Sequence, residues 1–321
     1  MSAAPDPVAA RIDDGAFLLI DKPRGPSSHQ VTAWARDLLG VPVAGHAGTL
    51  DPNVSGLLWV GVGPALKLLP LVLEFPKRYV GAVTFHAKVG ARDLDRVLKE
   101  FTGPIYQTPP VRSAVKRERR VRTIHRLTLV EHDGPRAIVD VVADSGTYVR
   151  TLAVDLGEAL GLGAHLEELR RIATGPFDEA ASVSLTRLAD LVEARRAGDP
   201  APLLAALHPI REVWQEFPTI VLREAAASAV AHGAGLARGG IQKVTGSFGP
   251  GARVALVTAA GTLVATGVAR YDAGEVEKVP HGWVVDETRV FVDPARFPAL
   301  WQRPKRGAAG GAAGGAAAPA S

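Results

Sequence analysis

The sequence predicts a protein of mixed helices and strands that is divided into two domains. The chain has 321 residues, which is more than a single hydrophobic core usually holds. In roughly the first two thirds of the chain, apolar residues recur with both the helical and the strand period. Beyond Pro218 the pattern changes to short strands separated by glycines. That change predicts a small, mostly β domain of about 85 residues.

The first elements are a loose segment, a strand and a helix. We expect the loose segment over residues 1–14 and the short apolar strand over Phe17–Ile20. In the helix, apolar residues follow at positions i, i+3, i+4 and i+7. Ser27 or Ser28 is its expected N-cap, and Gly40 ends it.

The next elements are a loop, an apolar run, a strand and a second helix. The loop is expected over Ala44–Pro52, and the apolar run over Leu57–Val62 follows it. Apolar and polar residues alternate over Tyr79–Lys88, which predicts a half-buried strand. Asp93 is the expected N-cap of a helix that Gly103-Pro104 ends.

A hairpin and further helices complete the first domain. Strands over Ile124–Glu131 and Arg136–Ala143 flank Asp133-Gly134, a pair that favours a hairpin turn. Ser145-Gly146-Thr147 leads into a helix, and another short helix is expected near His165–Ile172. Helical periodicity then covers the region that ends at about Leu207.

The domain boundaries follow from these patterns. We expect the first domain over residues 15–216, the second over 217–303 and a disordered Gly/Ala-rich tail over 304–321. The expected strands of the second domain are Arg253–Thr258, Leu263–Arg270, Trp283–Asp286 and Arg289–Val292.

The composition excludes several classes of site. The chain has no cysteine, so disulfides, thiolate zinc sites, iron–sulfur clusters and cysteine nucleophiles are excluded. None of its nine histidines falls at a short metal-ligand spacing, so no metal is expected. The N-terminus carries acidic residues and no apolar core, and prolines and charges interrupt the longest apolar region, over Leu57–Phe75. We therefore expect a cytoplasmic protein.

The segment Gly45–Pro52 is the first candidate for chemistry. Its small residues allow a tight turn, and Asp51 precedes a proline, which favours extended backbone there. A carboxylate on a stiff loop is a candidate nucleophile or base. From spacing alone, an Asx turn in which Asp51 bonds its own backbone is the more common alternative, and His46 is by default a hydrogen-bonding loop histidine.

A basic segment is the second candidate. A stretch of fifteen residues contains seven basic residues and only one acid, Glu118. The whole chain, by contrast, carries a net charge of only +4. The basic residues of the stretch are Arg112, Lys116, Arg117, Arg119, Arg120, Arg122 and Arg126. A solvated face could carry such a run, but like charges at this density favour a polyanionic partner and a steep salt dependence of binding.

Two further residues could act in a site. Arg150 lies just inside a helix N-terminus, where the helix dipole disfavours a cation, so it needs either a partner carboxylate or solvent. Tyr79 begins a strand, where a tyrosine is commonly structural, but it could also be a stacking platform for a base.

Five ordered motifs together resemble the TruB family of pseudouridine synthases. They are GHAGTLDPNVSGLL over residues 45–58, KRYV over 77–80, PPVRSAVKR over 109–117, SGTYVRTLAVDLGEALG over 145–161 and AHLEELRR over 164–171. In addition, HGAGLARGGI over residues 232–241 is similar to part of a PUA domain. The resemblance implies an α+β fold, with a mixed, largely antiparallel sheet in the catalytic domain and a small β-barrel-like PUA domain.

The resemblance also implies roles for single residues. Asp51 matches the catalytic aspartate of the family, Arg150 the arginine that pairs with it, and Tyr79 the tyrosine that stacks on the target base. Its further implied substrate-binding residues are His46, Tyr148, Leu169 and Lys116. Its implied RNA-binding residues are Arg112, Arg117, Arg119, Arg120, Arg122, Gly233, Arg238 and Gly239. It implies no cofactor and no metal.

One branch of the family matches best. FTGPIYQTPPVRSAVKR over residues 101–117 resembles the dyskerin-like branch, whose members are catalytic subunits of H/ACA ribonucleoproteins. That resemblance implies a guide RNA, small H/ACA protein subunits and substrate rRNA or tRNA as partners, and the lack of Lys-rich extensions implies an archaeal member. Where the family usually has a glycine and an acid, the chain has Ala87-Lys88, so that loop is expected to differ.

Two other functions compete with this one. A non-catalytic RNA-binding scaffold would carry the same basic segment and PUA-like domain, but it would not need Asp51, Tyr79 and Arg150 together. A glycosidase-like hydrolase would need two cooperating carboxylates, and only Asp51 is a convincing one.

Overall fold

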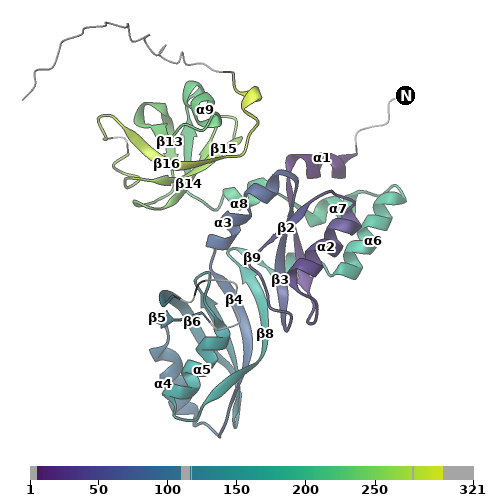
Figure 1. The fold of residues 1–321 in the computed structure, drawn as a ribbon, viewed down its shortest axis with the longest axis vertical. Helices are drawn as coiled ribbons and strands as arrows, with labels where there is room; N and C mark the ends of the chain where they lie inside the picture. Colours follow the sequence, from purple (N-terminus) through teal and green to yellow (C-terminus); the bar gives the residue numbers. More distant parts are fainter. Residues whose placement is uncertain (1–5, 110–115, 117, 277, 299–321) are drawn as a thin grey trace, which may run out of the picture. The chain divides into compact units, whose positions relative to one another are not determined.

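A computed structural model describes residues 6–109, 116, 118–276 and 278–298 of the chain. The chain forms two compact units that divide between Glu216 and Phe217 (Figure 1). The first unit begins with helix α1 (Pro7–Asp14), so the expectation of a loose segment there is wrong for these residues. Asp6 caps α1 by accepting a hydrogen bond from the backbone N–H of Val8, whose side chain is fully buried.

One mixed sheet organises the first unit. Its strands are β1 (Ala16–Lys22), β2 (Ala44–Ala47), β3 (Val54–Val62), β4 (Lys77–Phe85), β5 (Gly103–Gln107), β6 (Arg120–Asp133), β7 (Arg136–Ala143), β8 (Ala164–Thr174), β9 (Phe177–Asp178) and β10 (Leu207–Pro209). The order across the sheet is β10-β1-β3-β8-β4-β7-β6-β5, with β2 on β3 and β9 on β8. Among the described strands of this sheet only β3 and β8 pair in parallel, from Val54 opposite Leu169 to Gly56 opposite Arg171. The mixed, largely antiparallel fold is thus confirmed.

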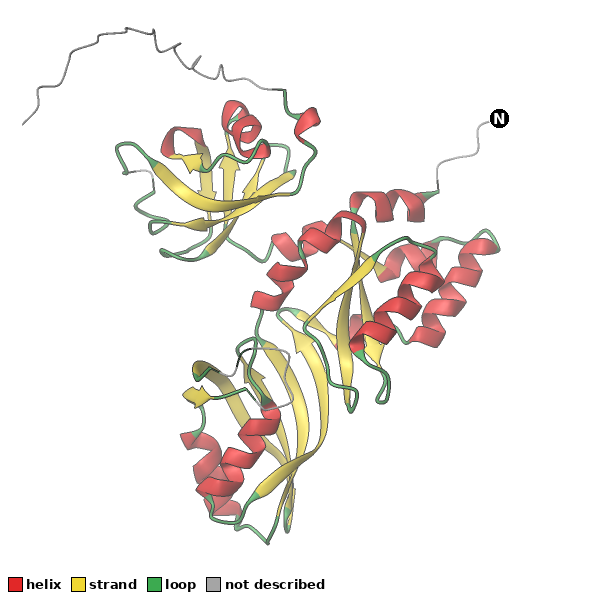
Figure 2. Cartoon of the chain, viewed as in Figure 1, coloured by secondary structure: helices red, strands yellow, loops and turns green. Residues whose placement is uncertain are grey.

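Two groups of helices cover the sheet of the first unit (Figure 2). Besides α1, the helices of this unit are α2 (Ser28–Leu39), α3 (Leu69–Glu74), α4 (Ala91–Glu100), α5 (Val149–Ala159), α6 (Leu185–Arg196), α7 (Ala201–Ala206) and α8 (Ile210–Trp214). Helices α2 and α6 bury their apolar sides against β1 and β3, whereas α4 and α5 form a second core with β4, β6 and β7. Ser27 is the N-cap of α2, and Gly40 ends it in the left-handed conformation, as expected.

Some local expectations are wrong. Residues near His165–Ile172 form β8, not a helix, because β8 pairs with β3 on one side and β4 on the other. Such pairing overrides the helix propensity of Leu, Glu and Arg. Gly90, not Asp93, is the N-cap of α4, and Asp93 lies in the first turn.

The second unit is a small β-rich domain. Its sheet has the order β12-β16-β15-β14-β11-β13, and α9 (Glu224–Ala231) packs on it. The strands are β11 (Thr219–Leu222), β12 (Leu236–Ala237), β13 (Ile241–Thr245), β14 (Arg253–Val257), β15 (Leu263–Ala269) and β16 (Trp283–Val290). Where two strands were expected near the end, β16 is continuous through Glu287, whose φ is +49°. No helix in the described part of either unit is long and apolar enough to cross a membrane.

Candidate active site

Asp51 lies on the turn between β2 and β3. Its side chain is about half exposed, at 49%, and its backbone carbonyl accepts a hydrogen bond from the N–H of Val54 at 3.0 Å. The carboxylate forms an ion pair with the guanidinium of Arg150. Within the described part of the chain, Asp51 therefore directs its carboxylate to a distant arginine rather than to its own backbone.

Arg150 is the second residue of α5. Tyr148, the N-cap of α5, provides no side-chain hydrogen bond to the helix, and the helix dipole would disfavour a lone cation at this position. Asp51 supplies the compensating negative charge. The pair joins residues 99 positions apart. An exposed ion pair adds little to the stability of the fold. Its main effect is to hold the two charged groups next to each other.

The Asp51–Arg150 pair lines a cavity of about 490 Å³. This volume is within the usual range for small-molecule sites. The other lining residues come from the turn after β1, the start of β3 and the middle of β8. They are Arg24, Pro52, Asn53, Val54, Leu166, Glu167, Glu168 and Leu169. Of the predicted site residues, the structure thus brings Asp51, Arg150 and Leu169 together.

A buried lysine holds the backbone that follows Asp51. Lys22 is fully buried at the end of β1, and its Nζ donates to the carbonyls of Pro23 at 2.8 Å, Pro52 at 3.3 Å and Val54 at 2.7 Å. Burial and the Arg171 charge lower the pKa of Lys22. These bonds fix the turn that follows the catalytic candidate.

A buried arginine holds the backbone that precedes Asp51. Arg171 on β8 is almost fully buried, and it donates from Nη2 to the carbonyl of Gly48 at 2.6 Å and from Nε to that of Leu57 at 2.8 Å. Gly48 has a φ of +70°, and a Cβ there would lie 3.0 Å from Nη1 of Arg171. Ser28 adds a paired contact, because its Oγ both donates to and accepts from the backbone of Leu50.

Tyr79 is near the cavity wall but does not line the cavity: it packs on the same core as the lining residues Leu166 and Leu169. It is half-buried on β4, opposite Arg171 on β8, and packs on the core beneath α5. Burial lowers the pKa of the Arg171 guanidinium, and Tyr79 partly opposes this effect. Tyr79 is not among the residues that line the cavity, so it contacts the support of the Asp51 turn rather than Asp51.

Gln107 connects the end of β5 to the start of α5. Its side chain is buried, and its backbone lies opposite Arg120 of the basic segment. The side-chain amide donates to the carbonyl of Tyr148 at 3.1 Å and accepts from the Tyr148 N–H at 2.9 Å. Tyr148 is two residues from Arg150, so the paired bonds fix the backbone from which the guanidinium extends.

His46 lies on β2, close to the Asp51 turn. Its ring meets that of His29 edge to face, with centroids 4.6 Å apart, and its Nε2 lies 3.4 Å from Oγ1 of Thr49. Burial, His29 and Arg171 lower the pKa of His46 below its ordinary value. This shift favours the neutral form of the ring.

The basic segment is only partly described. Arg112 and Arg117 lie outside the described residues. Lys116 and Arg120 both pair with Glu118, and the Arg119 guanidinium lies 4.5 Å from the centre of the exposed Tyr106 ring. A small pocket beside this segment is lined by Gln107, Pro109, Arg120, Arg122, Gly146 and Tyr148. None of these residues lines the Asp51 cavity.

The predicted residues of the second unit lie after α9. Gly233 follows α9 with a φ of +91°, and its N–H donates to the carbonyl of Val230. Arg238 and Gly239 lie in a 3₁₀ turn over Arg238–Gly240, and a Cβ on Gly239 would meet open space. They form part of the surface of this unit.

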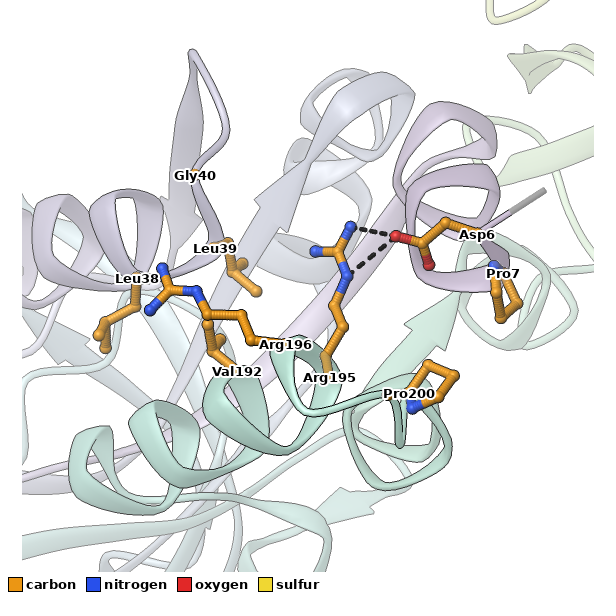
Figure 3. Close-up of a pocket in the computed structure, with 10 residues that line it drawn as sticks. Asp6, Pro7, Leu38, Leu39, Gly40, Val192, Arg195, Arg196 and Pro200 are labelled. Carbon is orange, nitrogen blue, oxygen red and sulfur yellow. Dashed lines mark hydrogen bonds and ion pairs between the residues drawn. The ribbon is translucent and has the colours of Figure 1, made fainter. Parts of the chain in front are cut away.

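A separate cavity of about 540 Å³ lies between α1, the end of α2 and α6 (Figure 3). Asp6 pairs with Arg195 across it. It contains none of the predicted site residues. Elsewhere in the described residues, no cluster of three His, Cys, Asp or Glu side chains could hold a metal.

Sequence reasoning missed Lys22, Gln107 and Arg171. Lys22 continues an apolar strand, which is a signal of burial, and Gln107 lies within the quoted stretch over residues 101–117. Arg171 ends a polar run and gives no such signal, because its burial depends on pairing with strands far away in the sequence.

Comparison with known families covers most of the chain. Residues 36–149 match the N-terminal domain of the TruB family pseudouridylate synthases, and residues 150–214 match the C-terminal domain of tRNA pseudouridylate synthase B. Residues 218–291 match the PUA domain. A probable tRNA pseudouridine synthase B of Pyrobaculum arsenaticum is 44% identical, over 91% of this chain and 89% of that protein. One from Methanothermobacter thermautotrophicus is 42% identical, over 92% of this chain and 91% of that protein.

Solved structures give the same assignment. The protein in the crystal structure of a Cbf5-Nop10-Gar1 complex is 36% identical, with a TM-score of 0.84 over 93% of this chain and 94% of that one. A chain of the archaeal box H/ACA sRNP Nop10-Cbf5 complex is 34% identical, with a TM-score of 0.80 over 94% of this chain and 96% of that one. The chain therefore belongs to the TruB family of pseudouridine synthases, in its dyskerin-like branch.

Proposed function

We propose that this pseudouridine synthase is the catalytic subunit of an H/ACA ribonucleoprotein that isomerises guide-selected uridines of rRNA, with tRNA as a further substrate. One observation carries the catalytic part of the proposal: Asp51 and Arg150 form an ion pair in the wall of a cavity large enough for a nucleoside. The similarity to chains from H/ACA complexes supports the partners, and the names of the curated relatives support tRNA.

The reaction requires little beyond a positioned carboxylate. The N1–C1′ bond of uridine breaks, the base turns, and a C5–C1′ bond forms. C5 loses its hydrogen and N1 takes up a proton, so the product is an isomer of the substrate. Asp51 is the group that acts on the sugar or the base, and the Arg150 guanidinium stabilises its negative charge and fixes its direction.

The target uridine must leave its stack to reach the cavity. Extrusion of a base costs a few kcal/mol, which contacts with the protein must offset. Leu169 lines the cavity, and His46 lies on β2 close to the Asp51 turn. Tyr79 packs on the same core as Leu166 and Leu169 of the cavity wall, and its proposed role is to stack on the base.

Release of tritium from C5 of uridine tests the proposal. The full chain is incubated with labelled rRNA fragments, alone or with a guide RNA and the small H/ACA proteins. We expect release from the guide-selected uridine only in the complete mixture. Guide-independent release from that uridine would contradict the guided function, and no release from either rRNA or tRNA would contradict the catalytic assignment of the site.

A further inference from the structure

We propose that Arg24 is a phosphate-binding residue at the rim of the Asp51 cavity, and that Glu168 is an exchangeable counter-ion that RNA displaces. The ligand is a backbone phosphate of the RNA strand that carries the target uridine. The inference rests on the proposed function, because it assumes that the cavity receives a nucleotide of RNA.

The turn that carries Arg24 is fastened to the turn that carries Asp51. The N–H of Gly25 donates to the carbonyl of Pro52 at 2.8 Å. The buried Lys22 donates from Nζ to the carbonyls of Pro23 and Pro52, which joins the same two turns. The backbone of Arg24 therefore keeps a fixed place relative to the reacting carboxylate, as a contact for the substrate backbone must.

The charges that line the cavity assign different tasks to its two arginines. Arg150 pairs with Asp51 and is committed to the chemistry. Arg24 lies on the same cavity wall but pairs with Glu168, from Nη1 to Oε1 at 2.8 Å. Arg24 is thus the lining arginine whose partner is not the catalytic carboxylate.

The acidic residues that line the cavity would repel an anionic ligand, so a basic residue such as Arg24 is needed to balance their charge. Glu167 lines the cavity too, and it pairs with Arg136 at 3.0 Å and accepts from Thr84 at 3.1 Å. Glu168 has Arg24 as its partner. Without Arg24, the rim would present an unpaired carboxylate to the RNA strand, and like charges repel.

The Arg24–Glu168 pair is suited to exchange. Both side chains are more than half exposed, at 52% and 56%. An ion pair between exposed side chains is weak in water. A guanidinium binds a phosphate more strongly, because it forms two parallel hydrogen bonds with it. A phosphate can therefore take the place of the carboxylate, and Glu168 can turn to solvent.

Equilibrium binding of a uridine-containing single-stranded RNA to the full protein, within its complex, tests the proposal. Arg24→Gln is expected to weaken binding about tenfold and to reduce the slope of log affinity against log salt by about 0.7. Glu168→Gln is expected to tighten binding about three- to tenfold, because it frees the guanidinium for phosphate. The change should fall mainly on the Kd and KM for RNA rather than on turnover at saturating RNA.

The double variant separates exchange from a general change of charge. If Glu168 acts through Arg24, then Glu168→Gln has little effect in the Arg24→Gln background. An equal gain in affinity in both backgrounds would overturn the proposal, as would an unchanged salt slope in Arg24→Gln. The exposed pair Arg36–Asp37 on α2 lines no part of the cavity, so Arg36→Gln and Asp37→Asn are matched controls.

The outcome is distinct from a failure of the proposed function. Release of tritium by the unaltered protein tests the chemistry at Asp51, whereas the salt slope tests only the contact at Arg24. Loss of turnover at saturating RNA in Arg24→Gln would also overturn the proposal, since it would place Arg24 in the chemistry or in the fold.

Discussion

The roles of Asp51 and Arg150 become evident only from the interaction between their two side chains. Each residue alone has an ordinary interpretation, as a turn aspartate and as a surface arginine. The ion pair brings them together from β2–β3 and α5 at the wall of one cavity. Lys22 and Arg171 hold the Asp51 turn from both sides, and Gln107 holds the start of α5.

Asp51→Asn tests the carboxylate directly. The amide keeps the shape of the side chain but removes its charge and most of its nucleophilicity. We expect turnover to fall at least about a thousandfold, roughly 4 kcal/mol of transition-state stabilisation, with RNA affinity nearly unchanged. Tritium release and RNA binding measure the two effects. Asp95→Asn, in an exposed ion pair on α4, is the control, and near-normal turnover of Asp51→Asn would refute the assignment.

Gln107→Met tests the support of Arg150. Methionine has a similar size, but it cannot pair with the backbone of Tyr148, so the start of α5 loses a fixed position. We expect single-turnover rates to fall about tenfold with little change in RNA affinity. Gln30→Met, at an exposed position of α2, is the control.

A cycle with Arg150→Ala shows whether Gln107 acts through the arginine. The effect of Gln107→Met on turnover should disappear in the Arg150→Ala background. If the two substitutions lower the rate independently, Gln107 acts elsewhere.

Among the elements, those with local sequence signals could be predicted from the sequence, whereas β8, which depends on distant strands, could not. Helix α2 and the β6–β7 hairpin follow from local signals, namely Ser27, Gly40 and Asp133-Gly134. The residues around Leu169 favour a helix locally, but they form β8 because their strand partners come from elsewhere in the chain. The motifs point to Asp51 and Arg150 as site residues. The buried residues that hold them, such as Arg171, could not be predicted because their burial depends on these long-range pairings.

The close approach of α5 to β8 depends on Gly157. A Cβ at this position would lie 2.3 Å from the backbone N of Ala164, so alanine would push α5 away from the start of β8. We expect Gly157→Ala to lower the free energy of unfolding by about 1–3 kcal/mol. Denaturant unfolding measures this, with Glu158→Ala at an exposed position of the same helix as the control. Unchanged stability would show that the two elements can separate without cost.

Asp140 joins three strands of the sheet by charge. Its carboxylate pairs with Arg78 of β4 at 2.7 Å and Arg126 of β6 at 3.2 Å. Burial raises the pKa of Asp140, but the two arginines outweigh burial and lower it below the usual 3.8. Because the folded-state pKa is the lower one, the stabilisation is present above pH 3.8 and is lost as the pH falls through the folded-state value.

Asp140→Asn tests this linkage. We expect it to lower the free energy of unfolding by about 1–3 kcal/mol at pH 7, because charge-assisted hydrogen bonds are lost. The difference from the unaltered protein should shrink as the pH falls below 3.8. Urea unfolding at a series of pH values measures it, and a difference that does not depend on pH would argue against the ionic origin.

At the scale of the whole molecule, RNA binding depends more on where the charges lie than on the net charge. The net charge of +4 is small, but the segment from Arg112 to Arg126 carries seven basic residues and one acid, and its residues from Arg120 onward belong to β6. Replacing Arg119, Arg120 and Arg122 together with glutamine should reduce the salt slope of RNA binding by about 2. Binding at several salt concentrations measures this, and an unchanged slope would remove these three residues from the RNA contact.

The parallel pairing of β3 with β8 in the first unit's sheet has a dynamic consequence. From Val54 opposite Leu169 to Gly56 opposite Arg171, a short ladder joins β3, which follows the Asp51 turn, to β8, which follows α5. Hydrogen–deuterium exchange should find the amides of this ladder opening sooner than those between β4 and β7, and a breathing motion there would vary the spacing of Asp51 and Arg150.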